Sequence, residues 1–164
     1  MFFLTMPNHR ALGIDPGVGR CGWAVIHVIG GKEILEGSGC FTTSPKDSPA
    51  ERLLALDQQL DVVLKKYIPG RLGIEKLYFT NNVTTAMAVS QARGVILLAA
   101  ARYHLPVTEL SPTTVKQSIT GYGRSDKKAI ATMIERLLKL EPRPRTDDEY
   151  DAIGIALTLA HQRT

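Results

Sequence analysis

The sequence predicts a single α/β domain in which helices flank a five-stranded mixed sheet. Short apolar runs bounded by turn residues fill the first part of the chain, and two more such runs alternate with segments of helical spacing after it. No linker, repeat or low-complexity stretch divides the 164 residues, which are 44% hydrophobic and can bury a core without disulfides or metals. We therefore expect one domain over residues 1–164, with 1–10 as a flexible N-terminal extension.

The first three predicted strands form an antiparallel meander, and the last two, which each follow a helical segment, are predicted to be parallel. Pro16-Gly17 ends the first apolar run, and Gly30-Gly31 is a hairpin signal between the second and the third. The strands are Leu12–Asp15, Cys21–Ile29, Glu33–Thr42, Arg71–Ile74 and Pro106–Leu110.

Apolar residues recur at helical spacing in five segments. These are Ala50–Tyr67, Ala86–Tyr103, Ser111–Gln117, Lys127–Leu140 and a last helix that ends near His161. The second segment is apolar nearly all the way round, so it should be buried on several sides or pack against a partner. A glycine-containing basic loop, Ile119–Asp126, follows the third segment, and Thr146 or Asp147 could cap the last helix.

The composition is compatible with a polyanionic partner without requiring one. Lys and Arg number 20 against 16 Asp and Glu, which gives a net charge of +4 and a sequence pI near 9.2. Cys21 and Cys40 lack metal-ligand spacing and are predicted to be reduced thiols. The apolar start of the chain is far too short for a signal peptide or a membrane span, so we expect a cytoplasmic protein with no membrane partner.

Two carboxylates, Asp15 and Glu75, directly follow apolar runs at the ends of predicted strands. Aspartate is a poor strand residue and is costly to bury alone, so a capping role in the Pro-Gly turn is one explanation of Asp15. If the first and fourth strands are neighbours, however, both carboxylates lie side by side at one edge of the sheet.

Asp148 and Asp151 form a second pair, one turn apart at the start of the last helix. Capping and helix-dipole effects explain Asp147, Asp148 and Glu149 well. They explain Asp151 poorly, because it begins the apolar face of that helix and should point inward rather than to solvent. Four carboxylates gathered in one place require hard cations such as Mg²⁺ or Mn²⁺, and two such ions are the usual apparatus for an in-line displacement at phosphorus.

Seven short motifs follow one another in the order and spacing of a known family. They are GIDPG with Asp15, GSGC at Gly37–Cys40, IE at Ile74-Glu75, SQARGV at Ser90–Val95, VKQ at Val115–Gln117, GYGRSDK at Gly121–Lys127 and DEYDAIGIA at Asp148–Ala156. Together they resemble RuvC, the bacterial Holliday-junction resolvase family, from about Leu12 to the C-terminus. The resemblance implies an RNase H-like fold, a homodimer, and resolution of four-way DNA junctions by paired symmetric nicks that leave 5′-phosphate and 3′-hydroxyl ends. It also implies a role in DNA recombination and repair, with RuvA and RuvB as branch-migration partners.

The same resemblance puts Asp15, Glu75, Asp148 and Asp151 on the metal-binding positions of the family. Asp15 would bridge two divalent ions, Mg²⁺ or Mn²⁺, while Glu75 binds one ion and Asp148 and Asp151 bind the other. Asp147 and Glu149 are near enough in sequence to be alternatives to Asp148.

Four cations are expected to contact DNA. Lys116 and Lys127 fall on family lysines that we expect to approach phosphates near the scissile bond, and Arg124 and Lys128 extend the same patch. The alternative for each is a solvated surface cation. The resemblance also implies an aromatic residue that stacks on bases near the cut.

Tyr78 takes that aromatic position, where a phenylalanine is more usual, and Phe79 follows at once, so either ring could stack. An ordinary core aromatic is the alternative. Arg93, within the SQARGV motif, is expected to be a structural or interface residue rather than a catalytic one.

Three other functions are considered. One is an RNase H-like nuclease of the same fold that processes RNA, and another is a junction-binding module without activity whose acids serve only as caps. The third is a phosphate-binding ATPase half-domain, which the sequence disfavours because it contains no second domain and no glycine-rich phosphate loop.

Overall fold

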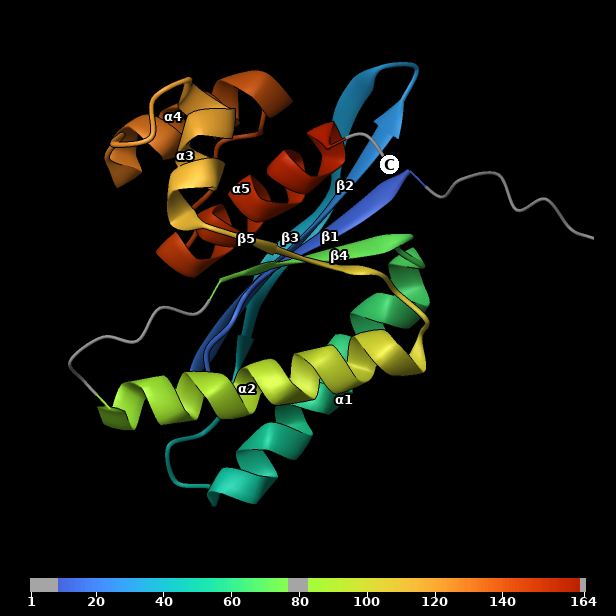
Figure 1. Ribbon diagram of the computed structural model, residues 1–164, viewed down its shortest axis with the longest axis vertical. Coiled ribbons are helices and arrows are strands. Elements are labelled where there is room, and N and C mark those ends of the chain that lie inside the picture. The colour runs from blue at the N-terminus through green and yellow to red at the C-terminus, as the bar shows by residue number, and fades with distance from the viewer. Residues whose placement is uncertain (1–8, 77–82, 163–164) are drawn as a thin grey trace, which may run out of the picture.

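The five strands form one mixed sheet with helices on both faces (Figure 1). The computed structural model describes residues 9–76 and 83–162. In chain order the elements are β1 (Arg10–Asp15), β2 (Arg20–Ile29), β3 (Lys32–Thr42), α1 (Pro49–Tyr67), β4 (Arg71–Glu75), α2 (Val83–Arg102), β5 (Val107–Leu110), α3 (Pro112–Thr120), α4 (Lys127–Leu138) and α5 (Asp147–His161). The sheet order is β3-β2-β1-β4-β5, antiparallel among the first three strands of the chain and parallel from β1 through β4 to β5. The predicted mixed sheet is confirmed.

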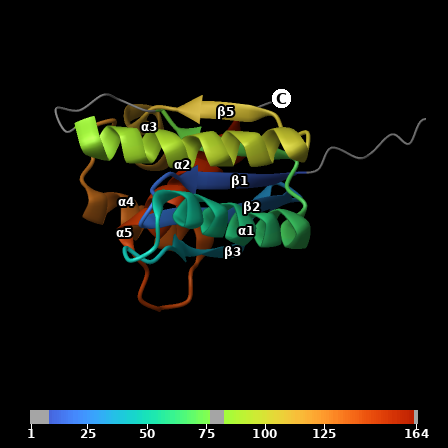
Figure 2. The ribbon, with the colours of Figure 1, turned by 90° about the horizontal axis from the view of Figure 1, so that it is seen from below.

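Large aliphatic side chains fill the space between one face of the sheet and helices α1 and α2, which lie side by side over that face (Figure 2). The fully buried members include Leu12 and Ile14 of β1, Leu72 and Ile74 of β4, Leu56, Leu60 and Leu64 of α1, and Ile96 of α2. Burial of one such side chain contributes roughly 1.5–3 kcal/mol relative to leaving it exposed. This layer therefore holds much of the stability of the fold.

Small residues line the opposite face, where α5 crosses the sheet. A Cβ atom at Gly13 of β1 would lie 2.4 Å from the carbonyl oxygen of Ala152, and one at Gly22 of β2 would lie 1.8 Å from that of Asp148. No side chain fits at such distances, so the backbone of α5 rests directly on the two strands. Helices α3 and α4 pack on the far side of α5 (Figure 1). The close contact brings the start of α5 to the end of β1, where Asp15 lies.

Several boundaries differ from the prediction. β1 begins at Arg10, whose backbone pairs with His27 of β2 and whose side chain forms an ion pair with Glu36, so the predicted flexible extension over 1–10 is too long. Helix α3 continues to Thr120 and ends on Gly121, which adopts φ +75° and caps the helix. The basic loop therefore starts later than predicted.

Helix α2 starts at Val83, earlier than the predicted Ala86. Among the described helices it alone is long and apolar enough to cross a membrane by length and composition. This is weak evidence for a membrane segment, because a core helix of a soluble protein passes the same test. Ala92, Ile96 and Ala99 of α2 are fully buried within the core layer described above.

Candidate functional site

Asp15 and Glu75 lie side by side at the ends of two neighbouring strands. β1 and β4 are parallel neighbours that stay in register up to the residue before each carboxylate. The two acids alternate along their strands with Gly13 and Gly73, both of which contact α5. Because successive side chains of a strand point to opposite faces, both carboxylates project on the α5 side of the sheet.

Four acidic residues in the first two turns of α5 have different surroundings. Asp147 is 73% exposed, whereas Glu149 is only 4% exposed and accepts a hydrogen bond from β3. Asp148 and Asp151 are close enough for their charges to act on Asp15. The structure thus brings Asp148 and Asp151 toward the strand-end carboxylates and gives Glu149 a separate environment.

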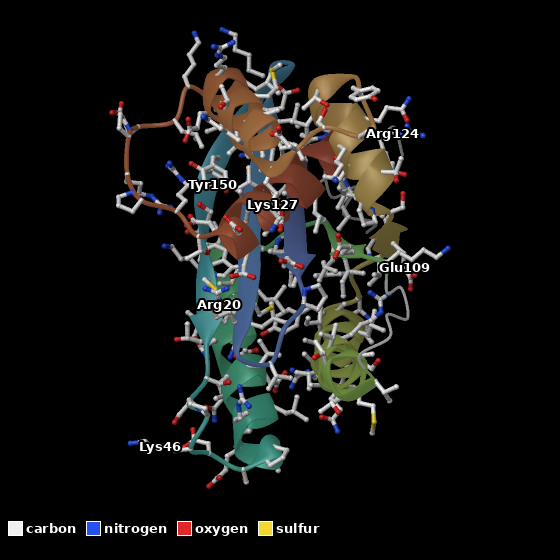
Figure 3. The ribbon with its side chains drawn as sticks, turned by 90° about the vertical axis from the view of Figure 1, so that its left-hand side faces the viewer. Arg20, Lys46, Glu109, Arg124, Lys127 and Tyr150 are labelled. Carbon is white, nitrogen blue, oxygen red and sulfur yellow. The ribbon has the colours of Figure 1, made fainter. Side chains whose placement is uncertain are left out.

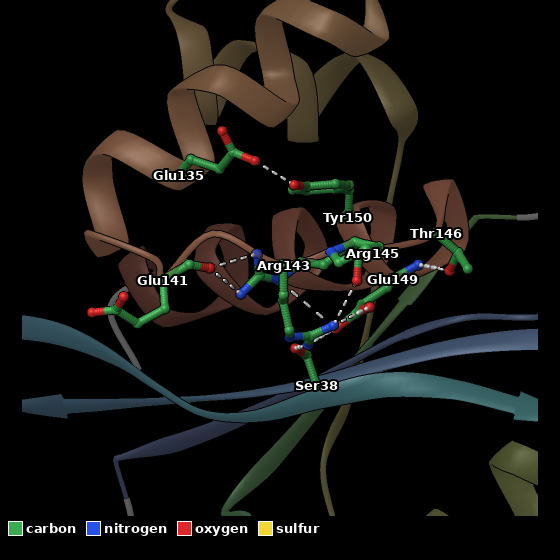
Figure 4. Close-up of polar contacts among 9 residues, drawn as sticks. Ser38, Glu135, Glu141, Arg143, Arg145, Thr146, Glu149 and Tyr150 are labelled. Carbon is green, nitrogen blue, oxygen red and sulfur yellow. Dashed lines mark hydrogen bonds and ion pairs between the residues drawn. The ribbon is translucent and has the colours of Figure 1, made fainter.

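Glu149 is held by a network that pins α5 to β3 and to the connector before it (Figure 4). Ser38 Oγ donates a hydrogen bond to Glu149 Oε1 (2.7 Å), and the Arg143 guanidinium donates to both carboxylate oxygens. Thr146 Oγ1 accepts a hydrogen bond from the backbone N–H of Glu149 (3.2 Å) and caps α5, as one of the two predicted caps. A buried carboxylate needs such partners. Glu149 therefore has a structural role and is a poor alternative to Asp148.

The carboxylates of the site disfavour one another's charged forms. Burial raises the pKa of Asp15 to about 8, and the negative charges of Glu75, Asp151 and Asp148 add to that rise. Burial also raises the pKa of Glu75 and of Asp151, in both cases against the opposing positive charge of Lys127. At neutral pH the protein alone supplies too little positive charge to keep all of these groups ionised.

The donor set suits a hard divalent cation. All four groups offer carboxylate oxygens, the ligands that Mg²⁺ and Mn²⁺ prefer. Asp148 Oδ2 is buried and accepts no hydrogen bond, although the Nε of Arg20 lies 3.1 Å away as an ion-pair partner. Within the described residues, no three His, Cys, Asp or Glu side chains are grouped so that they could hold an ion as they stand. The unmet negative charge, and the Asp148 oxygen that accepts no hydrogen bond, nevertheless fit a cation at this edge of the sheet.

Lys116 and Lys127 flank the carboxylates. Together with Glu75 and Asp151 they line a pocket of about 200 Å³ between α3, α4 and α5, which has a mainly apolar lining. The Nζ atom of Lys127 lies 3.6 Å from Asp151 and 3.3 Å from Asp147. Asp151 keeps 40% of its side-chain surface exposed at this pocket. The expectation that it points inward rather than to solvent is therefore wrong in part.

The other predicted DNA contacts lie further out or outside the described residues. Arg124 extends from the loop between α3 and α4, and Lys127 lies nearer the middle of the same view (Figure 3). Lys128 is exposed and borders a shallow depression on α4. Tyr78 and Phe79 fall within 77–82, outside the described residues.

Arg93 of α2 is a buried cation that reaches the strand end carrying Glu75. Its Nη1 donates a hydrogen bond to the backbone carbonyl of Glu75 (2.5 Å), and its Nη2 forms an ion pair with Glu109 of β5 (2.5 Å). The sequence indicated a structural or interface role for Arg93 from its place in the SQARGV motif, but not which carbonyl it holds. Arg20, the ion-pair partner of Asp148, carried no signal in the sequence.

Comparisons of the sequence with known proteins point to one family. The family model described as crossover junction endodeoxyribonuclease RuvC matches residues 11–160. RuvC of Heliobacterium modesticaldum is 44% identical over 153 residues, which cover 93% of this chain and 94% of the relative, and that of a Roseiflexus species is 44% identical over 152 residues, which cover 93% and 90%. The chain belongs to the RuvC family.

Structural comparison leads to the same family. The structure of T. thermophilus RuvC in complex with a Holliday junction substrate superposes with a TM-score of 0.86 at 33% identity, covering 91% of each chain. A yeast mitochondrial Holliday junction resolvase shares the fold, with a TM-score of 0.69 at 15% identity, over 94% of this chain and 78% of the yeast chain. The predicted RNase H-like fold and the predicted enzyme class, a crossover junction endodeoxyribonuclease that hydrolyses DNA phosphodiester bonds, are confirmed. Nucleases of this family depend on metal ions.

Proposed function

We propose that this protein resolves four-way DNA junctions by paired symmetric nicks that leave 5′-phosphate and 3′-hydroxyl ends. The observation that carries the proposal is the convergence of Asp15, Glu75, Asp148 and Asp151 on one edge of the sheet, on the scaffold of a junction-cutting family. Neither RNA processing nor inactive junction binding has a comparable observation in its favour. Recombination and repair are the processes that such products serve.

The four carboxylates are the proposed ligands of two Mg²⁺ or Mn²⁺ ions, with Asp15 between them. Such a pair of ions activates a water for attack and stabilises the leaving 3′ oxygen. Asp15 has to lose its proton when cations arrive, because its pKa is raised to about 8 in their absence. Lys127, now beside Asp151, would be free to contact a phosphate once a cation takes its place.

The cations around the site are the proposed DNA-binding surface. Lys116 and Lys127 contact the phosphates beside the cut, and Arg124 and Lys128 bind the backbone further along. Such contacts carry little base information, so branching is recognised through the shape of the DNA. Tyr78 or Phe79 is the proposed stacking residue at the cut.

A homodimer is proposed, with α2 at its interface. Met87, Leu97 and Leu98 leave an apolar face of α2 exposed. Gly94 lies in the middle of this helix, and a Cβ there would meet no atom within 4 Å. A glycine in a helix interior costs roughly 1 kcal/mol relative to alanine, so the packing of one chain gives no reason for it, whereas close approach of a second chain does. RuvA and RuvB as partners and a cytoplasmic location remain predictions from the resemblance.

The test is nicking of a synthetic four-way junction beside linear duplex and an RNA–DNA hybrid. We expect symmetric nicks in the junction alone when Mg²⁺ or Mn²⁺ is present. Asp15→Asn should abolish nicking and leave junction binding intact. The matched control is Asp147→Asn, which removes the same charge from an exposed neighbour and should nick normally.

Each outcome bears on a different part of the proposal. Equal cutting of branched and linear DNA would overturn the resolvase function, and cutting of the hybrid would favour the RNA-processing alternative. If Asp15→Asn nicks as well as the wild type, the assignment of the metal ligands is wrong.

A further inference from the structure

The loop between α3 and α4 presents one aromatic ring to solvent. Tyr122 is 60% exposed, and in the part of the chain that the structure describes it is the one aromatic among the large apolar side chains that remain exposed. A single exposed side chain is ordinary in a soluble domain. The backbone that carries this ring, however, is held by hydrogen bonds within its own loop.

Both backbone polar groups of Tyr122 are hydrogen-bonded within the loop. Its N–H donates to Thr120 Oγ1 (3.2 Å), and its carbonyl accepts from the N–H (3.2 Å) and the hydroxyl (2.9 Å) of Ser125. The hydroxyl oxygens of Thr120 and Ser125 are themselves 2.6 Å apart. These contacts close the loop on itself, so the ring is held out from a fixed base.

The two glycines beside Tyr122 serve the same arrangement. Gly121 adopts φ +75°, a conformation that other residues rarely adopt, and ends α3. A Cβ at Gly123 would lie 2.9 Å from Thr113 Cγ2, so the loop packs directly against α3. The backbone follows the helix closely, while the Tyr122 side chain between the two glycines stays exposed.

The surroundings of the ring are basic. Lys116 lies on α3, and Lys127 and Lys128 begin α4. Arg124 lies in the same loop, two residues after Tyr122. Asp126, the nearby acid, caps α4 and accepts a hydrogen bond from the N–H of Ala129 (2.8 Å). An exposed aromatic among cations is the arrangement that binds unstacked nucleic acid, since the cations hold phosphates while the ring stacks on a base.

We propose that Tyr122 stacks on one unstacked nucleobase at the branch point of a four-way junction and so helps to select branched over linear DNA. The inference rests on the proposed function. Unstacking a base costs least where pairing is already interrupted, which favours the branch point over a continuous duplex. Tyrosine gives a large contact area and loses little rotamer freedom on binding. Because hydrogen bonds within the loop already order the backbone, binding loses little backbone entropy.

The experiment compares Tyr122→Ala and Tyr122→Phe in the full chain, with Leu137→Ala as a similarly exposed apolar control near the far end of α4. Binding is measured with Ca²⁺ in place of Mg²⁺, on a four-way junction and on a duplex of the same sequence. We expect Tyr122→Ala to weaken junction binding roughly 5- to 150-fold, the range that corresponds to a stacking contribution of about 1–3 kcal/mol. Tyr122→Phe keeps the ring and should bind like the wild type, as should Leu137→Ala.

Fluorescence identifies the base. With 2-aminopurine placed at each branch-point position in turn, one position should be less fluorescent in the wild-type and Tyr122→Phe complexes than in the Tyr122→Ala complex. Equal junction binding by Tyr122→Ala and wild type would overturn this inference alone, as would an equal loss on duplex, which indicates a general DNA contact. A wild-type protein that does not prefer the junction would overturn the proposed function as well.

Discussion

The two faces of the sheet hold their helices in different ways. The α1–α2 face mainly stabilises the fold, whereas the α5 face positions the carboxylates of the site. On the α1–α2 face, large aliphatic side chains of both layers interdigitate. On the α5 face, Gly13 and Gly22 remove the side chains altogether and let the backbone of α5 touch the strands. Side-chain layers can adjust to a lost methyl group by small movements. A backbone contact leaves no such freedom, and it is the contact that sets where Asp148 and Asp151 lie relative to Asp15.

Adding a single methyl group to the α5 face should have the largest effect. The Cβ of Gly22→Ala would sit 1.8 Å from the carbonyl oxygen of Asp148, so the first turn of α5 has to move away from β2. We expect loss of roughly 2–4 kcal/mol of stability, in the range of severe overpacking. Nicking by the molecules that remain folded should fall at least about 100-fold, as expected when catalytic groups shift by about 1 Å. Stability is measured by urea unfolding and nicking on a four-way junction.

The counterpart on the other face is Leu60→Ala. Leu60 is fully buried between α1 and the sheet, and its truncation should cost roughly 2–5 kcal/mol. Its nicking rate per folded molecule should stay close to that of the wild type, because none of the four carboxylates projects on that face of the sheet. If Leu60→Ala loses as much activity per folded molecule as Gly22→Ala, the division between the two faces is wrong.

In the metal-free protein, the carboxylate cluster should lower the free energy of unfolding. Asp15→Asn should restore part of that stability. An unfolded Asp titrates near pH 4, whereas Asp15 in the fold has a pKa raised to about 8. Between these values the unfolded state has lost a proton that the folded state retains, so this residue lowers stability as pH rises from about 4 to about 8, with no further change above. We expect Asp15→Asn to be more stable than the wild type by roughly 1–3 kcal/mol at pH 9 and equal to it near pH 4, after allowing for the partial exposure of the site.

Thermal unfolding in EDTA across this pH range measures the effect, with Asp147→Asn as the exposed control that should show no such gain. Mg²⁺ should stabilise the wild type and leave Asp15→Asn nearly unchanged. A variant that is no more stable than the wild type at pH 9 would contradict the raised pKa.

What the sequence could predict of this site depends on how local each signal is. Asp15 and Glu75 were predictable because each directly follows a buried run, and Asp148 and Asp151 because helical spacing places them one turn apart. The separate role of Glu149 was not, because its partner Ser38 is 111 residues away along the chain. The small residues at the start of the last helix predicted that this helix lies close to the sheet, but the sequence did not show that Gly13 and Gly22 are the residues it touches.

The smallest expected effect concerns the outer surface of α2, which neither face of the sheet touches. A Cβ at Gly94 meets no atom within 4 Å, so Gly94→Ala should stabilise the isolated chain by roughly 0.5–1 kcal/mol through helix propensity alone. If a second chain approaches at Gly94, the same methyl group intrudes on that approach and weakens the dimer. Chemical unfolding at high dilution measures the first effect, and sedimentation across a concentration series measures the second. Ala101→Gly, at an exposed position of the same helix, tests the propensity effect in the opposite direction. A Gly94→Ala variant that is more stable but associates as the wild type does would remove Gly94 from the interface, because a contact close enough to require glycine cannot accept a methyl group.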